Sequence, residues 1–129
     1  MEFIQSNRAP AAVGPYSQAV SAGGFLFLSG QIALDPGSGE IVGSDIESQS
    51  RQVLANIHAV LEAAGRQMSD VVKTTVYLVD LADFQKFNGI YQSAFGSHRP
   101  ARATVQVSAL PKGARLEMDA IVSTGHGSP

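Results

Sequence analysis

Two strand-like segments of this chain are apolar on both faces, whereas only two segments show helical spacing. Residues 25–28 read Phe-Leu-Phe-Leu, and residues 71–79 are rich in β-branched and aromatic side chains. Side chains alternate between the faces of a strand, so a strand that is apolar throughout needs cover on both faces. Two helices can cover only one face of a sheet. The most economical cover for the other face is a second copy of the chain, and shielding by the chain's own loops is the alternative.

The order of the segments predicts an α+β fold, with a mostly antiparallel sheet and two helices packed on one of its faces. Residues 16–21 and 25–30 form a hairpin around Gly23-Gly24, and residues 35–39 form a second turn. The remaining strands are expected at residues 71–79, 102–109 and 114–123, with a turn at 111–113 joining the last two.

The first helix is the clearest local prediction. Ser44 and Glu47 match a capping box, apolar residues then recur at helical spacing, and Gly65 stands where the helix should end. The second helix is expected at residues 81–95, with Asp80 as its cap. Its apolar stripe indicates core packing, although a Phe at the rim of that stripe could shape a pocket. The stripe consists of Phe84, Phe87, Ile90, Tyr91 and Phe95.

Composition narrows the function classes. The 129 residues include no Cys, which excludes disulfides, Cys-ligated zinc and a thiol nucleophile. Nine basic and eleven acidic side chains give a net charge of −2, so nucleic acid is not an expected partner. The three histidines lack ligand spacing, so no metal site is predicted. No secretory signal or membrane span is recognised, and the cytoplasm is the expected location. We expect one domain over residues 1–129, with its core at 9–122 and a loose tail at 125–129.

Arg102 and Glu117 are the charged residues that most need an explanation. Alternation along the last two strands places both on the face that the helices leave uncovered. A guanidinium grips a carboxylate through two parallel hydrogen bonds, and a carboxylate can hold a water molecule for attack. An interface salt bridge for Arg102 and a pairing of Glu117 with Arg115 are the structural alternatives.

The expected hairpin keeps these two residues apart. With the turn centred near Lys112, Arg102 lies opposite Ile121, and Glu117 is then about 13 Å further along the strand. A bulge, an altered register or contributions from different subunits could bring the two together. We favour different subunits, because that arrangement also explains the uncovered face.

Five blocks of sequence resemble the reactive-intermediate deaminase (Rid, YjgF-type) family, and they follow one another in the family's order. The similarity extends over residues 9–122, and the blocks stand at residues 11–19, 28–32, 72–76, 102–107 and 116–121. The resemblance implies a chorismate-mutase-like α+β fold, assembled as a homotrimer with pockets between its subunits. For the deaminating subgroup it implies hydrolysis of 2-imino acids, such as 2-iminopropanoate and 2-iminobutanoate, to 2-oxo acids and ammonia. Such imines arise from the enamine products of pyridoxal-phosphate-dependent dehydratases.

The same resemblance implies roles for single residues. Arg102 binds the substrate carboxylate, Glu117 holds the attacking water, and Tyr16 lines the pocket. In the mechanism that we expect from these roles, Tyr16 also shuttles a proton. The remaining pocket residues are Ser29, Gly30 and Asn88, with a backbone contact from Thr104, where relatives often carry Cys. An imine is already electrophilic, so this chemistry requires no metal or cofactor.

Two other functions stay open. A ribonuclease or translation inhibitor, an activity also ascribed to this family, would want a basic, aromatic surface. A non-enzymatic carboxylate-binding or chaperone-like module would use the same cleft without hydrolysis. Glu117 beside Arg102 favours hydrolysis.

Overall fold

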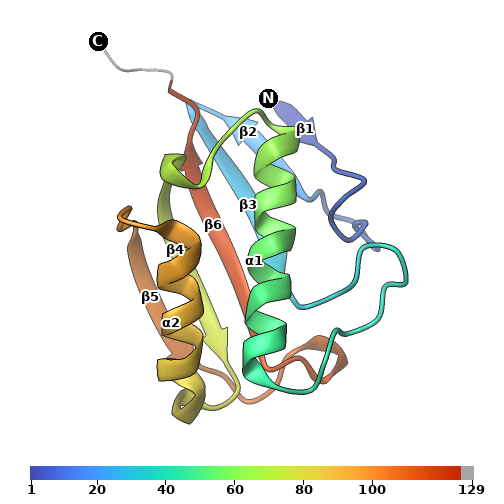
Figure 1. Cartoon of the computed structure of the whole chain (residues 1–129). Coiled ribbons are helices and arrows are strands. Elements are labelled where there is room, and N and C mark those ends of the chain that lie inside the picture. The colour runs from blue at the N-terminus through green and yellow to red at the C-terminus, as the bar shows by residue number, and fades with distance from the viewer. Residues whose placement is uncertain (126–129) are drawn as a thin grey trace.

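Both helices lie against the same face of a six-stranded sheet (Figure 1). The computed structural model describes residues 1–125, so most of the expected tail, including His126, lies outside the described residues. The strands are β1 (Glu2–Ile4), β2 (Ala19–Ala22), β3 (Phe25–Gln31), β4 (Val71–Leu78), β5 (Ala101–Gln106) and β6 (Leu116–Ser123). The helices are α1 (Ile46–Ala63) and α2 (Phe84–Phe95), and short 3-10 turns span Met68–Asp70, Leu81–Asp83 and Pro111–Gly113. The predicted α+β class, with both helices on one face, is confirmed.

The last two strands do not form the expected hairpin. The strand order is β1-β2-β3-β6-β4-β5, so β6 lies in the middle of the sheet and β5 at its edge. β5 runs parallel to β4, whereas the other pairings are antiparallel. A parallel pair needs a crossover connection, and α2 provides it between β4 and β5. The prediction that Arg102 faces Ile121 is therefore wrong.

The helix caps differ from the sequence prediction in detail. α1 is capped by Asp45, whose carboxylate accepts a hydrogen bond of 2.8 Å from the Ser48 amide. Ser44 therefore does not cap this helix. Asp80 caps the 3-10 turn before α2 through the Ala82 amide, so α2 itself begins three residues later than predicted, at Phe84. Gly65 follows the end of α1 with a φ of +70°, a conformation that favours glycine.

The two predicted turns near the N-terminal half are present. Gly23 and Gly24 both have positive φ angles, +62° and +85°, as a two-residue hairpin turn between β2 and β3 requires. In the second turn the Asp35 carboxylate accepts hydrogen bonds from the amides of Gly37 and Ser38. These turns connect elements without adding a layer to the fold.

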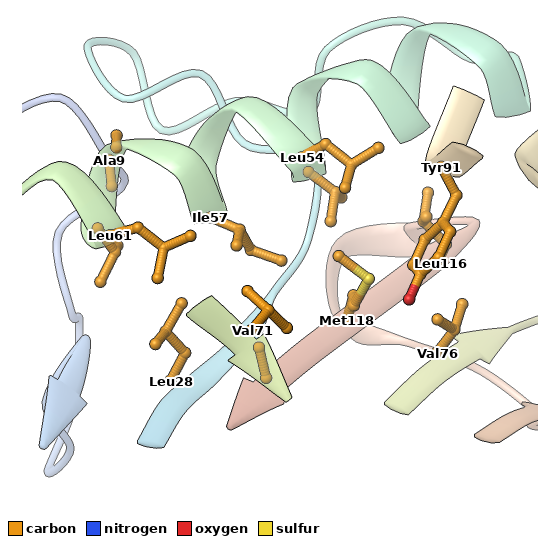
Figure 2. Packing of buried hydrophobic residues seen from close by; sticks show 14 of the residues in the cluster. Ala9, Leu28, Leu54, Ile57, Leu61, Val71, Val76, Tyr91, Leu116 and Met118 are labelled. Atoms are coloured by element: carbon orange, nitrogen blue, oxygen red, sulfur yellow. The ribbon is translucent and has the colours of Figure 1, made fainter. Parts of the chain in front are cut away.

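The hydrophobic core lies between the helices and the near face of the sheet (Figure 2). Ile57 and Leu61 of α1 point toward strand residues such as Met118 (Figure 2). Along β6 the residues at 116, 118, 120 and 122 are all buried, as alternation predicts. Each fully buried large aliphatic side chain contributes about 1.5–3 kcal/mol to folding, so this layer holds the sheet and helices together.

The opposite face of the sheet is open, and it carries exposed apolar side chains. Phe25 and Phe27 of β3 remain 43% and 45% exposed, while Leu26 and Leu28 between and after them are buried in the core. Val105 of β5 is 43% exposed. No helix of the described chain covers these side chains, because both helices lie on the other face (Figure 1).

Candidate active site

Arg102 lies on the helix-covered face, contrary to the prediction. In the parallel pairing it stands beside Thr74 of β4, whose buried hydroxyl points to α2. Arg102 therefore reaches under α2 at the edge of the sheet. The prediction assumed that the apolar side chains of this strand face the core, whereas Val105 is 43% exposed on the opposite face.

The guanidinium of Arg102 is held although the residue is exposed. Its Nη1 donates a hydrogen bond of 2.7 Å to Oδ1 of Asn88 on α2. Its Cζ lies 4.7 Å from the centre of the Tyr91 ring and 5.3 Å from that of the Phe84 ring. These contacts fix the planar group and leave other N–H donors available to an anion. No carboxylate within residues 1–125 forms an ion pair with it.

Tyr91 is fixed in turn by the sheet. Its hydroxyl lies 2.7 Å from Oγ1 of Thr74, and the residue is only 7% exposed. Burial raises the pKa of Tyr91, so the hydroxyl remains a neutral hydrogen-bonding group at ordinary pH. A chain of contacts thus leads from β4 through α2 to the Arg102 guanidinium.

A hollow of about 370 Å³ opens beside this guanidinium, and we call it the Arg102 hollow. It is lined by Asn88, Tyr91, Gln92, Phe95, His98, Arg99, Pro100 and Arg102. Two of the predicted site residues, Arg102 and Asn88, therefore share one cavity.

Glu117 lies in a second hollow, of about 330 Å³, which we call the Glu117 hollow. Tyr16 and Gly30 also line it. The pairing of β3 with β6 is irregular between Leu28 and Gln31, which places Gly30 directly against Glu117. A Cβ at Gly30 would lie only 2.8 Å from the Glu117 carboxyl carbon. The Glu117 carboxylate can therefore occupy this position only because residue 30 has no side chain.

Glu117 is suited to accept a proton. Burial raises its pKa, and the nearby negative charge of Asp119 raises it further. Asp119 itself accepts a hydrogen bond of 3.0 Å from the Tyr77 hydroxyl. A carboxylate with a raised pKa is a stronger base than an exposed one, and it can orient and deprotonate water.

Two other predicted site residues, Ser29 and Thr104, are not among the residues that line the two hollows. The Ser29 hydroxyl donates to the Ser17 carbonyl, which ties β3 to the segment that carries Tyr16. Thr104 lies two residues after Arg102 on β5, and within the described chain its buried hydroxyl has no hydrogen-bond partner. Tyr16 is 55% exposed at the mouth of the Glu117 hollow.

The two halves of the predicted site do not meet within one chain. β4 separates β5 from β6, Arg102 is level with Thr74, and Glu117 is level with Tyr77. That offset amounts to about 10 Å along the strands and about 10 Å across them. The two side chains also lie on opposite faces of the sheet.

Sequence reasoning missed part of the Arg102 environment. Phe84 and Tyr91 were assigned to the apolar stripe of the second helix, yet both rings pack against the guanidinium. The signal was available, because Phe84, Asn88 and Tyr91 are spaced four and three residues apart and so share a helix face. The sequence pattern predicts no role for Arg99, which also lines the Arg102 hollow.

The described residues, 1–125, contain neither a cluster of metal-binding side chains nor a helix that could cross a membrane. Nowhere in residues 1–125 do three His, Asp or Glu side chains gather as a metal ion would require. Neither helix has the length and apolar character needed to cross a membrane.

Comparison with known proteins decides the family. A profile described as endoribonuclease L-PSP matches residues 6–124. The chain belongs to this family. This member is 55% identical over 120 residues to a RutC family protein of Pyrococcus horikoshii, with 93% of this chain and 95% of the relative covered. It is 47% identical to the human protein named 2-iminobutanoate/2-iminopropanoate deaminase, over 95% of this chain and 89% of the human one.

A solved structure extends the likeness to three dimensions. Escherichia coli TdcF, crystallised with bound serine, superimposes with a TM-score of 0.91 at 42% identity, covering 95% of this family member and 98% of TdcF. The predicted membership of the Rid family is confirmed, since the relatives include proteins named for that family and for the deaminase.

Proposed function

We propose that this protein hydrolyses short 2-imino acids, such as 2-iminopropanoate and 2-iminobutanoate, to 2-oxo acids and ammonia. The observation that carries the proposal is the Arg102 guanidinium, which is oriented by Asn88 and Tyr91 beside a cavity and forms no ion pair with a carboxylate of the described chain. Such a group is ready to bind a carboxylate, and that grip contributes about 1.5–3 kcal/mol. The name of the human relative supports the choice of imino acids.

The reaction needs a held substrate and an activated water. Arg102 binds the carboxylate of the substrate. Glu117 takes a proton from water as the water oxygen bonds to C2, and it passes that proton to the imine nitrogen. The resulting carbinolamine loses its hydroxyl proton to Glu117, the C–N bond breaks, and the nitrogen leaves with that proton as ammonia. Glu117 ends as a carboxylate, and Tyr16 is placed to relay a proton at the mouth of its hollow.

We further propose that the working site forms between copies of the chain. One chain holds Arg102 and Glu117 in separate hollows. The open sheet face with Phe25, Phe27 and Val105 offers the apolar surface for the contact. A contact between unlike surfaces closes into a ring, and the family resemblance suggests three chains. Light scattering tests this assembly, and a stable, active monomer would contradict it.

The activity is tested by feeding threonine to a threonine dehydratase while semicarbazide traps the released imine. Added protein should speed the appearance of 2-oxobutanoate and lower the yield of trapped imine. Arg102→Ala should abolish the effect, and Arg102→Lys, which keeps the charge but loses the two-pronged grip, should restore only part of it. Full activity of Arg102→Ala would remove the carboxylate-binding role.

The family description favours a second candidate, RNA cleavage. The net charge of −2 argues against a general nucleic-acid surface. Incubation with a structured RNA separates the two functions, because RNA cleavage that survives Arg102→Ala would point to a different site. Binding of 2-oxobutanoate without any turnover of the imine would instead indicate a carboxylate-binding module.

A further inference from the structure

The Arg102 hollow contains more positive charge than one carboxylate requires. Its lining includes two guanidinium groups, Arg99 and Arg102, and the half-buried imidazole of His98. Among residues 1–125, no Asp or Glu lines it. Within residues 1–125, neither arginine forms an ion pair, although the whole chain carries a net charge of −2. Two permanent cations at one cavity favour an anion of charge −2 over one of charge −1.

Arg99 is held in place by the end of α2. Its Nη1 donates hydrogen bonds of 2.6 Å to the Gly96 carbonyl and 3.0 Å to the His98 carbonyl. The other guanidinium nitrogens make no hydrogen bond within the described chain, so they can bind a ligand. One nitrogen thus anchors the side chain and the remaining N–H groups keep their donor capacity.

His98 fixes the backbone that carries Arg99. Its Nε2 lies 2.7 Å from the Val71 carbonyl, and its ring packs 6.2 Å from the Phe95 ring, centre to centre. The segment before β5 is therefore tied both to β4 and to the end of α2. A cation on a fixed segment loses little conformational entropy when it binds an anion.

The spacing of the two arginines suits a short diacid. Three residues of chain separate their Cα atoms by at most about 11 Å, and both long side chains reach the same cavity. The volume of about 370 Å³ falls within the usual range for small-molecule sites, roughly 300–1,000 Å³.

We infer that the substrate range of this protein includes 2-imino dicarboxylates, with Arg102 on the carboxylate next to the imine carbon and Arg99 on the distal carboxylate. The inference rests on the proposed imine hydrolysis, and it adds Arg99 as the residue that determines specificity. The reaction at C2 is unchanged, because the distal carboxylate takes no part in bond making or breaking.

The inference about 2-imino dicarboxylates is tested by comparing the hydrolysis of two imines of different charge. L-Glutamate oxidase supplies 2-iminoglutarate and threonine dehydratase supplies 2-iminobutanoate, each with semicarbazide as the competing trap. The wild-type protein should accelerate hydrolysis of both. Arg99→Gln should lower kcat/KM for 2-iminoglutarate about tenfold more than kcat/KM for 2-iminobutanoate, mainly through KM. Arg51→Gln, which removes the same charge from an exposed position on α1, should leave the ratio of the two values unchanged.

Binding gives a second readout. Calorimetry with the two reaction products should show tighter binding of 2-oxoglutarate than of 2-oxobutanoate, and Arg99→Gln should reduce that preference while Arg99→Lys retains part of it. Hydrolysis of 2-iminobutanoate alone, or a substrate ratio that Arg99→Gln does not change, would overturn the inference and leave the proposed function standing. If the protein accelerates the hydrolysis of neither imine, both the inference and the proposed function are wrong.

Discussion

The guanidinium carbon of Arg102 lies 4.7 Å from the centre of the Tyr91 ring, and the hydroxyl of that ring lies 2.7 Å from Oγ1 of Thr74. Tyr91 therefore acts as a positioning residue, since it orients Arg102 from a buried anchor. Arg102 needs such support because it extends from β5, the strand at the edge of the sheet.

Removing the ring should weaken substrate binding. Tyr91→Leu should raise KM for 2-iminobutanoate by about 2–30-fold, the range that corresponds to a cation–π contact of about 0.5–2 kcal/mol. Tyr91→Phe keeps the ring and loses only the hydroxyl, so its KM should stay near the wild-type value while its melting temperature falls. Steady-state kinetics and thermal unfolding measure the two effects. Equal values of KM in both variants would show that the ring does not orient Arg102.

Mixing two inactive variants should restore activity. Arg102→Ala and Glu117→Ala damage different hollows, so in the proposed ring of three chains, a ring that contains both variants has one interface where the two intact halves meet. Random mixing in equal amounts should then restore about a quarter of the wild-type sites. The measurement is the imine assay after the mixed chains are unfolded and refolded together. A mixture as inactive as its components would mean that one chain supplies both residues.

The pH profile should respond to Asp119. In the proposed mechanism Glu117 acts as a carboxylate, so activity should fall as the pH drops through its pKa, which burial and the charge of Asp119 both raise. Asp119→Asn removes that charge and keeps an acceptor for the Tyr77 hydroxyl. The pKa of Glu117 should therefore fall, and the acid limb of kcat/KM should move to lower pH. An unchanged limb, or one moved to higher pH, would contradict the role of Glu117 as the base.

Gly30 should tolerate no side chain. The Cβ of Gly30→Ala would meet the Glu117 carboxyl group, which must then move from its place. Displacing a catalytic group by about 1 Å can cost about 100-fold in rate, so kcat should fall by that order. Gly89→Ala is the matched control, because a Cβ at this position on α2 meets nothing within 4 Å. A wild-type kcat in Gly30→Ala would show that the added Cβ does not displace the Glu117 carboxyl group from its active position.

The N-terminal cap of α1 can be assigned to Asp45 or to its neighbour Ser44 by mutation. Asp45→Ala should lower the melting temperature by a few degrees, since the Ser48 amide loses its acceptor. Ser44→Ala should have little effect, although the sequence motif favoured Ser44. Thermal unfolding followed by circular dichroism distinguishes the two, and a larger loss in Ser44→Ala would reverse the assignment.

Local patterns predicted the parts of this fold that are local. Helical spacing located α1, and alternation identified the buried face of β6. The place of β5 could not be found in this way, because an edge strand beside β4 and a hairpin partner of β6 have the same local pattern. The difference depends on how α2 packs, which is a property of the whole chain.

In the candidate site, too, local patterns predicted some features correctly, and the features that depend on the whole fold were missed. Alternation correctly separated Glu117 from the core, but it put Arg102 on the wrong face of the sheet, because the apolar side chain of Val105 lies on the open face and not in the core. The roles of Tyr16, Ser29, Gly30, Asn88 and Thr104 came from the family resemblance. The aromatic support of Arg102 was hidden within a stripe that serves both the core and the cavity, since Tyr91 belongs to both.

The placement of the two hollows on opposite faces has a genetic consequence. In a closed ring of three chains, Arg102 of each chain would complete a site with one neighbour, and Glu117 of that chain would complete a site with the other neighbour. A single copy defective at both positions would silence the sites on both of its sides and spare only the site between its two healthy neighbours. Beside a normal allele, mutant chains that still assemble would lower the activity of the normal chains in the same ring.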